Sequence, residues 1–181
     1  MKKAARAAGL PGLQGSEHIG ITVPDLEQAV LFLTDVIGCE FVFDGGPTIS
    51  DPEIMRGQLD VHPDASMRYC FLRCGRGVNF EIFEYKSPDQ RTAPPRNSDI
   101  GGHHIAFYVD DFSAALEHLR SHGVEIVGEP NAIAYGPAAG STWVYFKAPW
   151  GLQLELVSYP KGKGYERNAK ALLWHPGHPL R

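Results

Sequence analysis

The sequence contains an internal repeat, and this repeat constrains the fold more than any other feature. The segment GSEHIGITVPDLEQAVLFLTDVIGCEFV at 15–42 aligns with GGHHIAFYVDDFSAALEHLRSHGVEIV at 101–127, and GVNFEIFEY at 77–85 aligns with GLQLELVSY at 151–159. The matched residues include His18 with His104, Asp25 with Asp111, Glu81 with Glu155, and Tyr85 with Tyr159. Two copies of one order of features indicate a single structural unit that is present twice.

Each copy reads as a strand, a helix, a strand and then two further strands. The runs HIGITV and HIAFYV alternate with a period of two, as expected for strands. An aspartate follows each run in an N-cap position and opens an amphipathic segment that ends near Gly38 or Gly123. Short strands are expected at 39–44 and 124–127, and the last two strands of each copy are joined by glycine-containing turns. The sequence therefore predicts an α+β fold of two fused βαβββ modules.

The repeat also sets the expected organisation of the chain. We expect a flexible N-terminal arm at 1–14, a first βαβββ module at 15–86, a linker at 87–102, a second βαβββ module at 103–160, and a C-terminal tail with a short helix at 161–181. The linker is rich in proline, serine and aspartate. The first copy carries an extra segment, TISDPEIMRGQLDVHPDA, which is expected to hold a short helix.

Composition excludes several classes of function. The formal net charge of −4 provides no basic surface for nucleic acid, and no apolar run approaches the length of a membrane span. The three cysteines show no CxxC spacing, which argues against a disulfide framework or a structural zinc site. We therefore expect a cytoplasmic protein that binds neither nucleic acid nor membrane.

Strand alternation decides which of two adjacent histidines can serve a site. Neighbouring side chains of a strand point to opposite faces, so His103 and His104 cannot share one. The first strand divides into an apolar face with Ile19, Ile21 and Val23 and a second face with His18, Gly20 and Thr22. The same division, applied to every strand, places four equivalent residues on one concave face: His18, Glu81, His104 and Glu155. His103 and Glu84 point away from it.

This set of side chains has the chemistry of a metal site. Two imidazoles and two carboxylates suit a divalent ion such as zinc, nickel, cobalt, manganese or iron. Four ligands on an octahedral ion leave two positions for two substrate oxygens. Polarisation of a substrate carbonyl acidifies the neighbouring C–H and stabilises an enolate. We therefore predict a divalent metal ion as the cofactor and a small-molecule carbonyl or thioester as the substrate; no residue is assigned to an organic cofactor.

The same motifs resemble the vicinal oxygen chelate superfamily, which includes glyoxalase I, methylmalonyl-CoA epimerase, extradiol dioxygenases, and fosfomycin and bleomycin resistance proteins. The resemblance covers about residues 15 to 160 and rests on EHIGITVPDLEQAVLFLTDVIGCEFV, VNFEIFEY, HHIAFYVDDFSAALEHLRSHGVEIV and APWGLQLELVSYP. It implies paired βαβββ modules whose curved mixed sheets surround a metal-binding cleft. It also implies that the metal ligands are His18, Glu81, His104 and Glu155.

Two enzymes of that superfamily guide the expected reaction. Glyoxalase I has the same His-Glu-His-Glu set, but the positions where it grips glutathione hold Thr22 and Tyr85 here. In methylmalonyl-CoA epimerase a carboxylate before the third strand acts as a base, and Asp64 stands near that position. The resemblance implies a lyase or an isomerase that abstracts a proton next to a carbonyl through a metal-bound enediolate or enolate. Glu81 or Glu155 is the candidate base, with Asp64 as a further one.

Two alternative functions remain open, and the resemblance also indicates an oligomeric state. An extradiol dioxygenase would use two histidines and one glutamate with iron and dioxygen. A metal-free binding module of the antibiotic resistance kind would not need the four ligands at all. Proteins that resemble this one commonly form homodimers, so we expect a homodimer, with the metal site inside one chain or shared between two.

Overall fold

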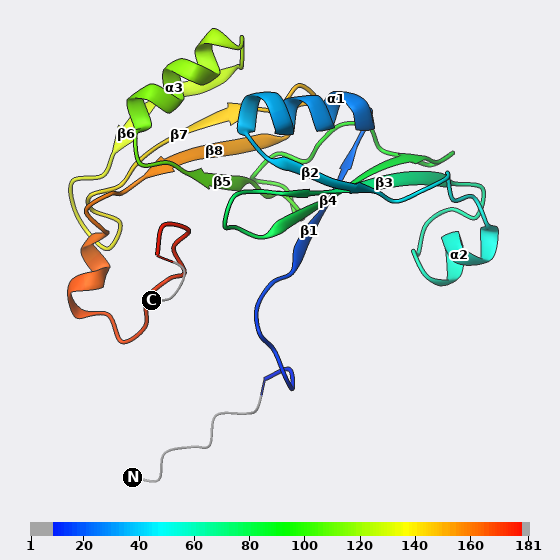
Figure 1. Cartoon of the computed structure of the whole chain (residues 1–181), viewed down its shortest axis with the longest axis horizontal. Coiled ribbons are helices and arrows are strands. Elements are labelled where there is room, and N and C mark those ends of the chain that lie inside the picture. The colour runs from blue at the N-terminus through cyan, green and yellow to red at the C-terminus, as the bar shows by residue number, and fades with distance from the viewer. Residues whose placement is uncertain (1–8, 179–181) are drawn as a thin grey trace.

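The protein, seen in a computed structural model that describes residues 9–178, consists of two four-stranded mixed sheets of the same topology (Figure 1). The first sheet has the order β1-β4-β3-β2, with β1 at His18–Val23, β4 at Asn79–Lys86, β3 at Ser66–Arg73 and β2 at Glu40–Asp44. The second has the order β5-β8-β7-β6, with β5 at Ile105–Tyr108, β8 at Gln153–Ser158, β7 at Thr142–Lys147 and β6 at Ile126–Ala132. β1 runs parallel to β4, and β5 runs parallel to β8. The predicted α+β fold with two equivalent βαβββ units is confirmed.

Each unit has one main helix that begins at the predicted aspartate. The Asp25 side chain accepts a hydrogen bond from the backbone N–H of Gln28 at the start of α1 (Leu26–Leu31), which continues as a π-helical segment, η1 (Phe32–Ile37). Asp111 caps α3 (Phe112–Ser121) in the same way. Capping oxygens satisfy backbone N–H groups that the first turn of a helix leaves free.

The two units differ in the segments that lie outside the repeat. The insertion of the first unit contains α2 (Pro52–Gly57), which confirms the short helix expected there. Within the described part of the C-terminal segment, residues 161–178, the one helical element is a 3₁₀ turn, η2 (Gly164–Asn168). Residues 87–102 contain no helix or strand. Most of the N-terminal arm predicted at 1–14 lies outside the described residues.

One hydrophobic core lies between the sheets and their helices and joins both units. Phe80 of β4 and Phe146 of β7 are 2% and 1% exposed within it. Phe80 meets Phe107 edge to face at 6.2 Å, and Phe32 meets Trp150 in the same way at 5.7 Å. Because both contacts join one unit to the other, the two units pack as a single body rather than as separate domains.

The opposite side of each sheet points away from α1 and α3 and is called the open face here (Figure 1). In the first unit, a second hydrophobic cluster covers one end of this face. It is formed by Met55, Ala65 and Met67 of the insertion and β3, packed against Tyr69, Phe83 and Tyr85 of the sheet. The C-terminal segment lies on the open face of the second unit (Figure 1). No helix among the described residues is long and apolar enough to cross a membrane.

Candidate metal centre

Strand alternation places the predicted ligands on the open face of each sheet. Along β4 the half-buried Glu81 stands between Phe80 and Ile82, which are 2% and 0% exposed on the core side. Along β8 Glu155 stands between the buried Leu154 and Leu156. Polar side chains thus occupy the face that the helices leave uncovered, as a period-two strand requires.

The structure joins these residues into two equivalent pairs. The Nε2 atom of His18 lies 3.1 Å from Oε2 of Glu81, and the Nε2 atom of His104 lies 3.0 Å from Oε2 of Glu155. The glutamate side chains are 18% and 16% exposed and the histidines 40% and 36% exposed, so the two environments are closely matched. A nitrogen and an oxygen about 3 Å apart have the spacing of adjacent ligands on an octahedral ion with bonds of about 2.1 Å. Each pair therefore fits two ligand positions of a divalent metal ion.

The two pairs do not meet within one chain. Among residues 9–178, the only group of three or more potential ligands with all atoms within 4.8 Å of one another is Asp25, Glu27 and Glu84. No third member of the predicted quartet therefore joins either His–Glu pair. In this structure the four residues therefore do not gather around one point within a single copy of the chain.

The first pair has a hydrogen-bonded support. Nδ1 of His18 contacts a carboxylate oxygen of Glu17, and the other oxygen of Glu17 accepts a bond of 3.0 Å from the Asn79 side chain. The bond to Glu17 raises the pKa of His18, and it is also the main cause that lowers the pKa of Glu17. A carboxylate on the far ring nitrogen fixes the tautomer that leaves Nε2 free to bind a metal.

The second pair lacks this arrangement in the described part of the chain. The residue before His104 is His103, whose Nδ1 lies 3.0 Å from the carbonyl oxygen of Gly101. His103 and His104 both line one open cavity of about 490 Å³, so the orientation of His103 away from the pair stays a prediction. The two histidines of the quartet therefore differ in their support, although their distances to glutamate are nearly equal.

Aromatic rings flank both pairs. Phe71 stands opposite Glu81 in the β3–β4 register, meets the His18 ring edge to face at 5.6 Å and stacks on Phe43 at 4.8 Å. Tyr145 stands opposite Glu155 and meets the His104 ring at 5.2 Å. Neither Phe71 nor Tyr145 was among the site residues predicted from the sequence. The hairpin registers were the signal that could have found both.

The contacts of the predicted base Asp64 are with His62 rather than with either His–Glu pair. Its side chain is 77% exposed, and its ionic neighbour is Nδ1 of His62 at 3.9 Å. Its backbone N–H also donates to that nitrogen. The structure therefore joins Asp64 to the insertion of the first unit, and its role as a base stays a prediction.

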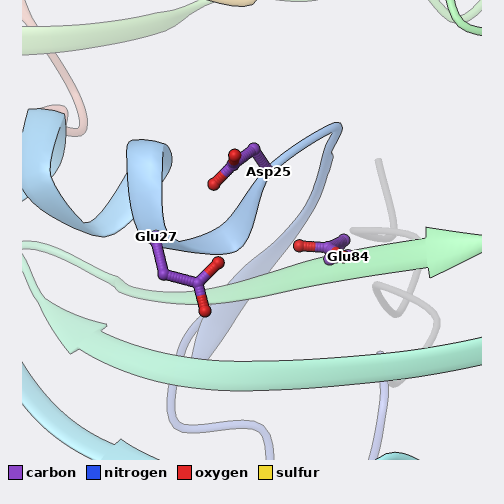
Figure 2. Close-up of side chains that lie close together, drawn as sticks. All are labelled: Asp25, Glu27 and Glu84. Carbon is purple, nitrogen blue, oxygen red and sulfur yellow. The ribbon is translucent and has the colours of Figure 1, made fainter.

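The acidic group Asp25, Glu27 and Glu84 has a structural explanation (Figure 2). Arg68 donates to Glu27 at 2.5 Å and to Glu84 at 2.7 Å, and the backbone N–H of Leu26 donates to Glu84 at 2.9 Å. These bonds to Arg68 are the main cause that lowers the pKa of Glu27 and of Glu84. Arg68 supplies the main positive charge of this cluster, the ammonium of Lys86 lies 3.8 Å from Glu84, and the cluster ties the start of α1 to β3 and β4. Glu84 points to the buried side, as predicted.

Two open cavities of about 550 Å³ each lie beside the first strand of each unit. The cavity along β1 is lined by Thr22, Tyr85, the 90–95 segment, His103 and Trp150, among others. The cavity along β5 is lined by Glu155, Tyr108, Tyr159, Lys163 and Trp174, among others. Of these two cavities the second reaches Glu155 of the quartet, and a further open cavity of about 490 Å³ reaches His104. The cavity that contains Glu155 is called the candidate substrate cavity here.

Comparison with known proteins gives a consistent result. A sequence model of the family described as Glyoxalase/Bleomycin resistance protein/Dioxygenase superfamily matches residues 15–156. A 2-epi-5-epi-valiolone epimerase from an Actinomyces species is 46% identical over 171 residues, which span 93% of this chain and 92% of that protein. The uncharacterized protein YaeR of Escherichia coli K12 is 30% identical over 80% of this chain and 96% of its own length. A glyoxalase family protein from Bacillus cereus superposes with a TM-score of 0.65 at 18% identity, covering 85% of this chain and 98% of that one, and shows the fold alone.

Proposed function

We propose that this chain is a metal-dependent epimerase acting next to a ketone carbonyl. It belongs to the Glyoxalase/Bleomycin resistance protein/Dioxygenase superfamily and is an enzyme of its vicinal oxygen chelate type. The observation that carries this proposal is the 46% identity to a 2-epi-5-epi-valiolone epimerase across 93% of the chain. The name of that relative denotes a ketone whose stereochemistry is inverted at one centre. We propose the same hydroxylated ketone as the substrate of this chain.

The chemistry of inversion fits two equivalent carboxylates. A proton on the carbon next to a carbonyl is acidic because the resulting anion is delocalised onto the carbonyl oxygen. Inversion requires a base to remove this proton from one face and an acid to return it to the other. Glu81 and Glu155 hold the same position in the two units, and we propose that Glu81 of one copy of the chain and Glu155 of a second copy take these two roles.

His18, Glu81, His104 and Glu155 are the residues that would hold the metal. The donor types and the N–O distances of 3.1 and 3.0 Å fit a divalent ion. When bound, such an ion supplies Lewis-acid polarisation of the ketone oxygen and thereby acidifies the neighbouring C–H. The histidines must be neutral to bind it, so metal binding releases any proton that Glu17 helps His18 to retain.

We further propose that two copies of the chain complete each site. Since the two His–Glu pairs do not meet within one chain, the pair of one copy must face the other pair of a second copy. The edge strand β2 supports such a contact, because Phe41, Val42 and Phe43 are 49%, 56% and 47% exposed. Three consecutive exposed apolar residues on a sheet edge are typical of a surface that another chain covers.

Mixing of variants tests the shared site. One variant carries His18→Ala and Glu81→Gln, and the other carries His104→Ala and Glu155→Gln. Either variant alone should bind no metal, whereas an unfolded and refolded equal mixture should bind about a quarter of the wild-type amount, because random pairing restores one site in half of the dimers. A mixture that binds no metal, together with a monomeric mass of the wild type by light scattering, would refute the shared site.

Solvent exchange tests the reaction. The metal-loaded protein is incubated with 2-epi-5-epi-valiolone in deuterium oxide, and deuterium next to the ketone is followed by NMR together with the ratio of epimers. We expect exchange and inversion that a chelator abolishes and that Glu155→Gln slows by about 100-fold or more. Glu129→Gln, an exposed carboxylate on β6 of the same unit, serves as the control and should retain the wild-type rate. Absence of exchange with zinc, nickel, cobalt, manganese and iron would refute the epimerase, and catechol cleavage with dioxygen uptake would favour the dioxygenase instead.

A further inference from the structure

The C-terminal segment at 161–178 follows the part of the chain that the family model matches, and it is fixed to the second unit. The backbone N–H of Gly164 donates to the carbonyl oxygen of Ala139 at 2.8 Å, and that of Tyr165 donates to Pro137 at 2.9 Å. These bonds tie η2 to the loop between β6 and β7. The segment is thus an ordered part of the second unit at this point of the fold.

Aromatic contacts hold the same segment over the open face. The His175 ring meets Tyr108 at 4.3 Å and Tyr159 at 4.9 Å, and the Lys163 ammonium lies 4.2 Å above the Tyr159 ring. Tyr159 continues the alternation of β8 and shares its face with Glu155. Because the ring of His175 rests on this pair of tyrosines, the residue before it is carried to the edge of the candidate substrate cavity.

That residue is Trp174. Its side chain is 54% exposed, and it lines the cavity of about 550 Å³ together with Glu155 and Lys163. Its neighbour Leu173 is 67% exposed but lines a different, smaller cavity with Tyr165. Trp174 therefore offers an exposed apolar ring to the same cavity that Glu155 lines.

We propose that Trp174 and Lys163 form the substrate-recognition wall of this cavity, a role that rests on the proposed function. The indole packs against the C–H face of the hydroxylated ketone, and the Lys163 ammonium donates to its hydroxyl oxygens. Pockets for small ligands combine apolar and aromatic walls with a few placed polar groups in this manner.

Two observations favour this assignment over a purely structural tail. The likeness to the epimerase spans 93% of the chain, which is more than residues 1–156 contain, so it extends into the C-terminal segment. In the first unit the residue equivalent to Tyr159 is Tyr85, which packs against the cluster of Met55 and Met67. The C-terminal segment therefore gives the second unit a wall that the repeat itself does not encode.

Calorimetric titration of the full-length protein with 2-epi-5-epi-valiolone tests the proposal without depending on turnover. Trp174→Ala should weaken the apparent Kd by about tenfold, which corresponds to about 1.4 kcal/mol for a lost aromatic contact, and Trp174→Phe should weaken it by about threefold. Leu173→Ala is the matched control in the same segment and should stay within about twofold of wild type. Lys163→Met should weaken binding by about fivefold. In exchange assays, Trp174→Ala should raise KM and leave kcat within about threefold.

The outcomes separate this inference from the proposed function. If Trp174→Ala binds as tightly as Leu173→Ala, or if the wild type binds no ketone at millimolar concentration, the recognition wall is refuted. If the wild type binds the ketone and Trp174→Ala does not, but no deuterium exchanges, the wall is supported and the epimerase is refuted. Thermal unfolding of Trp174→Ala should occur within about 2 °C of wild type, which excludes loss of fold as the cause.

Discussion

The two units of this protein carry equivalent His–Glu pairs on their open faces but differ in the segments that cover these faces. Their His–Glu pairs have N–O distances of 3.1 and 3.0 Å, and their helices start at equivalent capping aspartates. The open face of the first unit is covered at one end by the insertion with α2, whereas the C-terminal segment crosses that of the second. The repeat is thus retained at the proposed metal ligands and is lost in the segments that cover the open faces.

A second difference concerns the support of the ligands. Glu17 and Asn79 hold the ring of His18, whereas the position before His104 is occupied by a histidine that contacts a backbone carbonyl. The ring beside His18 is a phenylalanine and the ring beside His104 is a tyrosine. Neighbouring side chains therefore support the His18 ring more fully than the His104 ring, whereas polar side chains line the cavities of both units.

The largest expected effect tests whether the units are one body. Phe80→Ala removes a ring that is 2% exposed and contacts Phe107 of the other unit, so it should lower the free energy of unfolding by about 3–5 kcal/mol. All three tryptophans lie at 143 or later, so their fluorescence reports on the second unit and its tail. In urea the fluorescence and circular dichroism transitions should shift together. Leu31→Ala, at an exposed site on α1, should change stability by less than about 0.5 kcal/mol. A fluorescence midpoint unchanged by Phe80→Ala would mean that the units unfold separately.

The next effect compares the two histidines of the quartet with the neighbour of one of them. His18→Ala and His104→Ala should each lower metal affinity by about 100-fold or more, because each removes one of the two donors of a pair. His103→Ala should leave the affinity unchanged, since its ring contacts Gly101 instead. Metal content after gel filtration measures all three. Equal losses in the His103 and His104 variants would show that the assignment is wrong by one residue.

A smaller effect should separate the supports of the two units. Glu17→Gln keeps the shape of the side chain but removes the charge that faces Nδ1 of His18, so metal affinity should fall by about tenfold. Competition with a chelating dye measures this change, and the thermal stability of the metal-free protein should be nearly unaffected. A wild-type affinity in this variant would indicate that the contact with Glu17 does not orient the ligand.

The smallest effect concerns acid stability. Arg68 lowers the pKa of Glu84 in the folded protein, so the stabilisation is fully present above the pKa of the unfolded state and is lost as the pH falls through the lowered folded pKa. The equivalent residue of the second unit is the uncharged Ser158, so this dependence should arise in the first unit. Glu84→Gln should reduce the loss of stability below about pH 4.5 by roughly 1 kcal/mol, as Arg68 is partly exposed. Urea midpoints measured from pH 3 to pH 7 check this, and an unchanged slope would contradict it.

The sequence by itself determined the repeat, the order of the strands within each unit and the face on which each side chain lies. Period-two alternation is a local property of a strand, so it was enough to place Glu81 on the open face and Glu84 on the buried one. The capping aspartates could also be predicted from the sequence, because an N-cap depends only on the residues of the next turn.

Tertiary structure alone decided which of these residues meet. The sequence is consistent with four ligands around one ion, yet the packing of Phe80 on Phe107 and of Phe32 on Trp150 fixes the units so that the two His–Glu pairs stay apart. The neighbours Phe71 and Tyr145, and the path of the C-terminal segment to Trp174, likewise depend on register and on docking between segments distant in sequence. Such contacts follow from how whole surfaces fit together, and no local period in the chain records them.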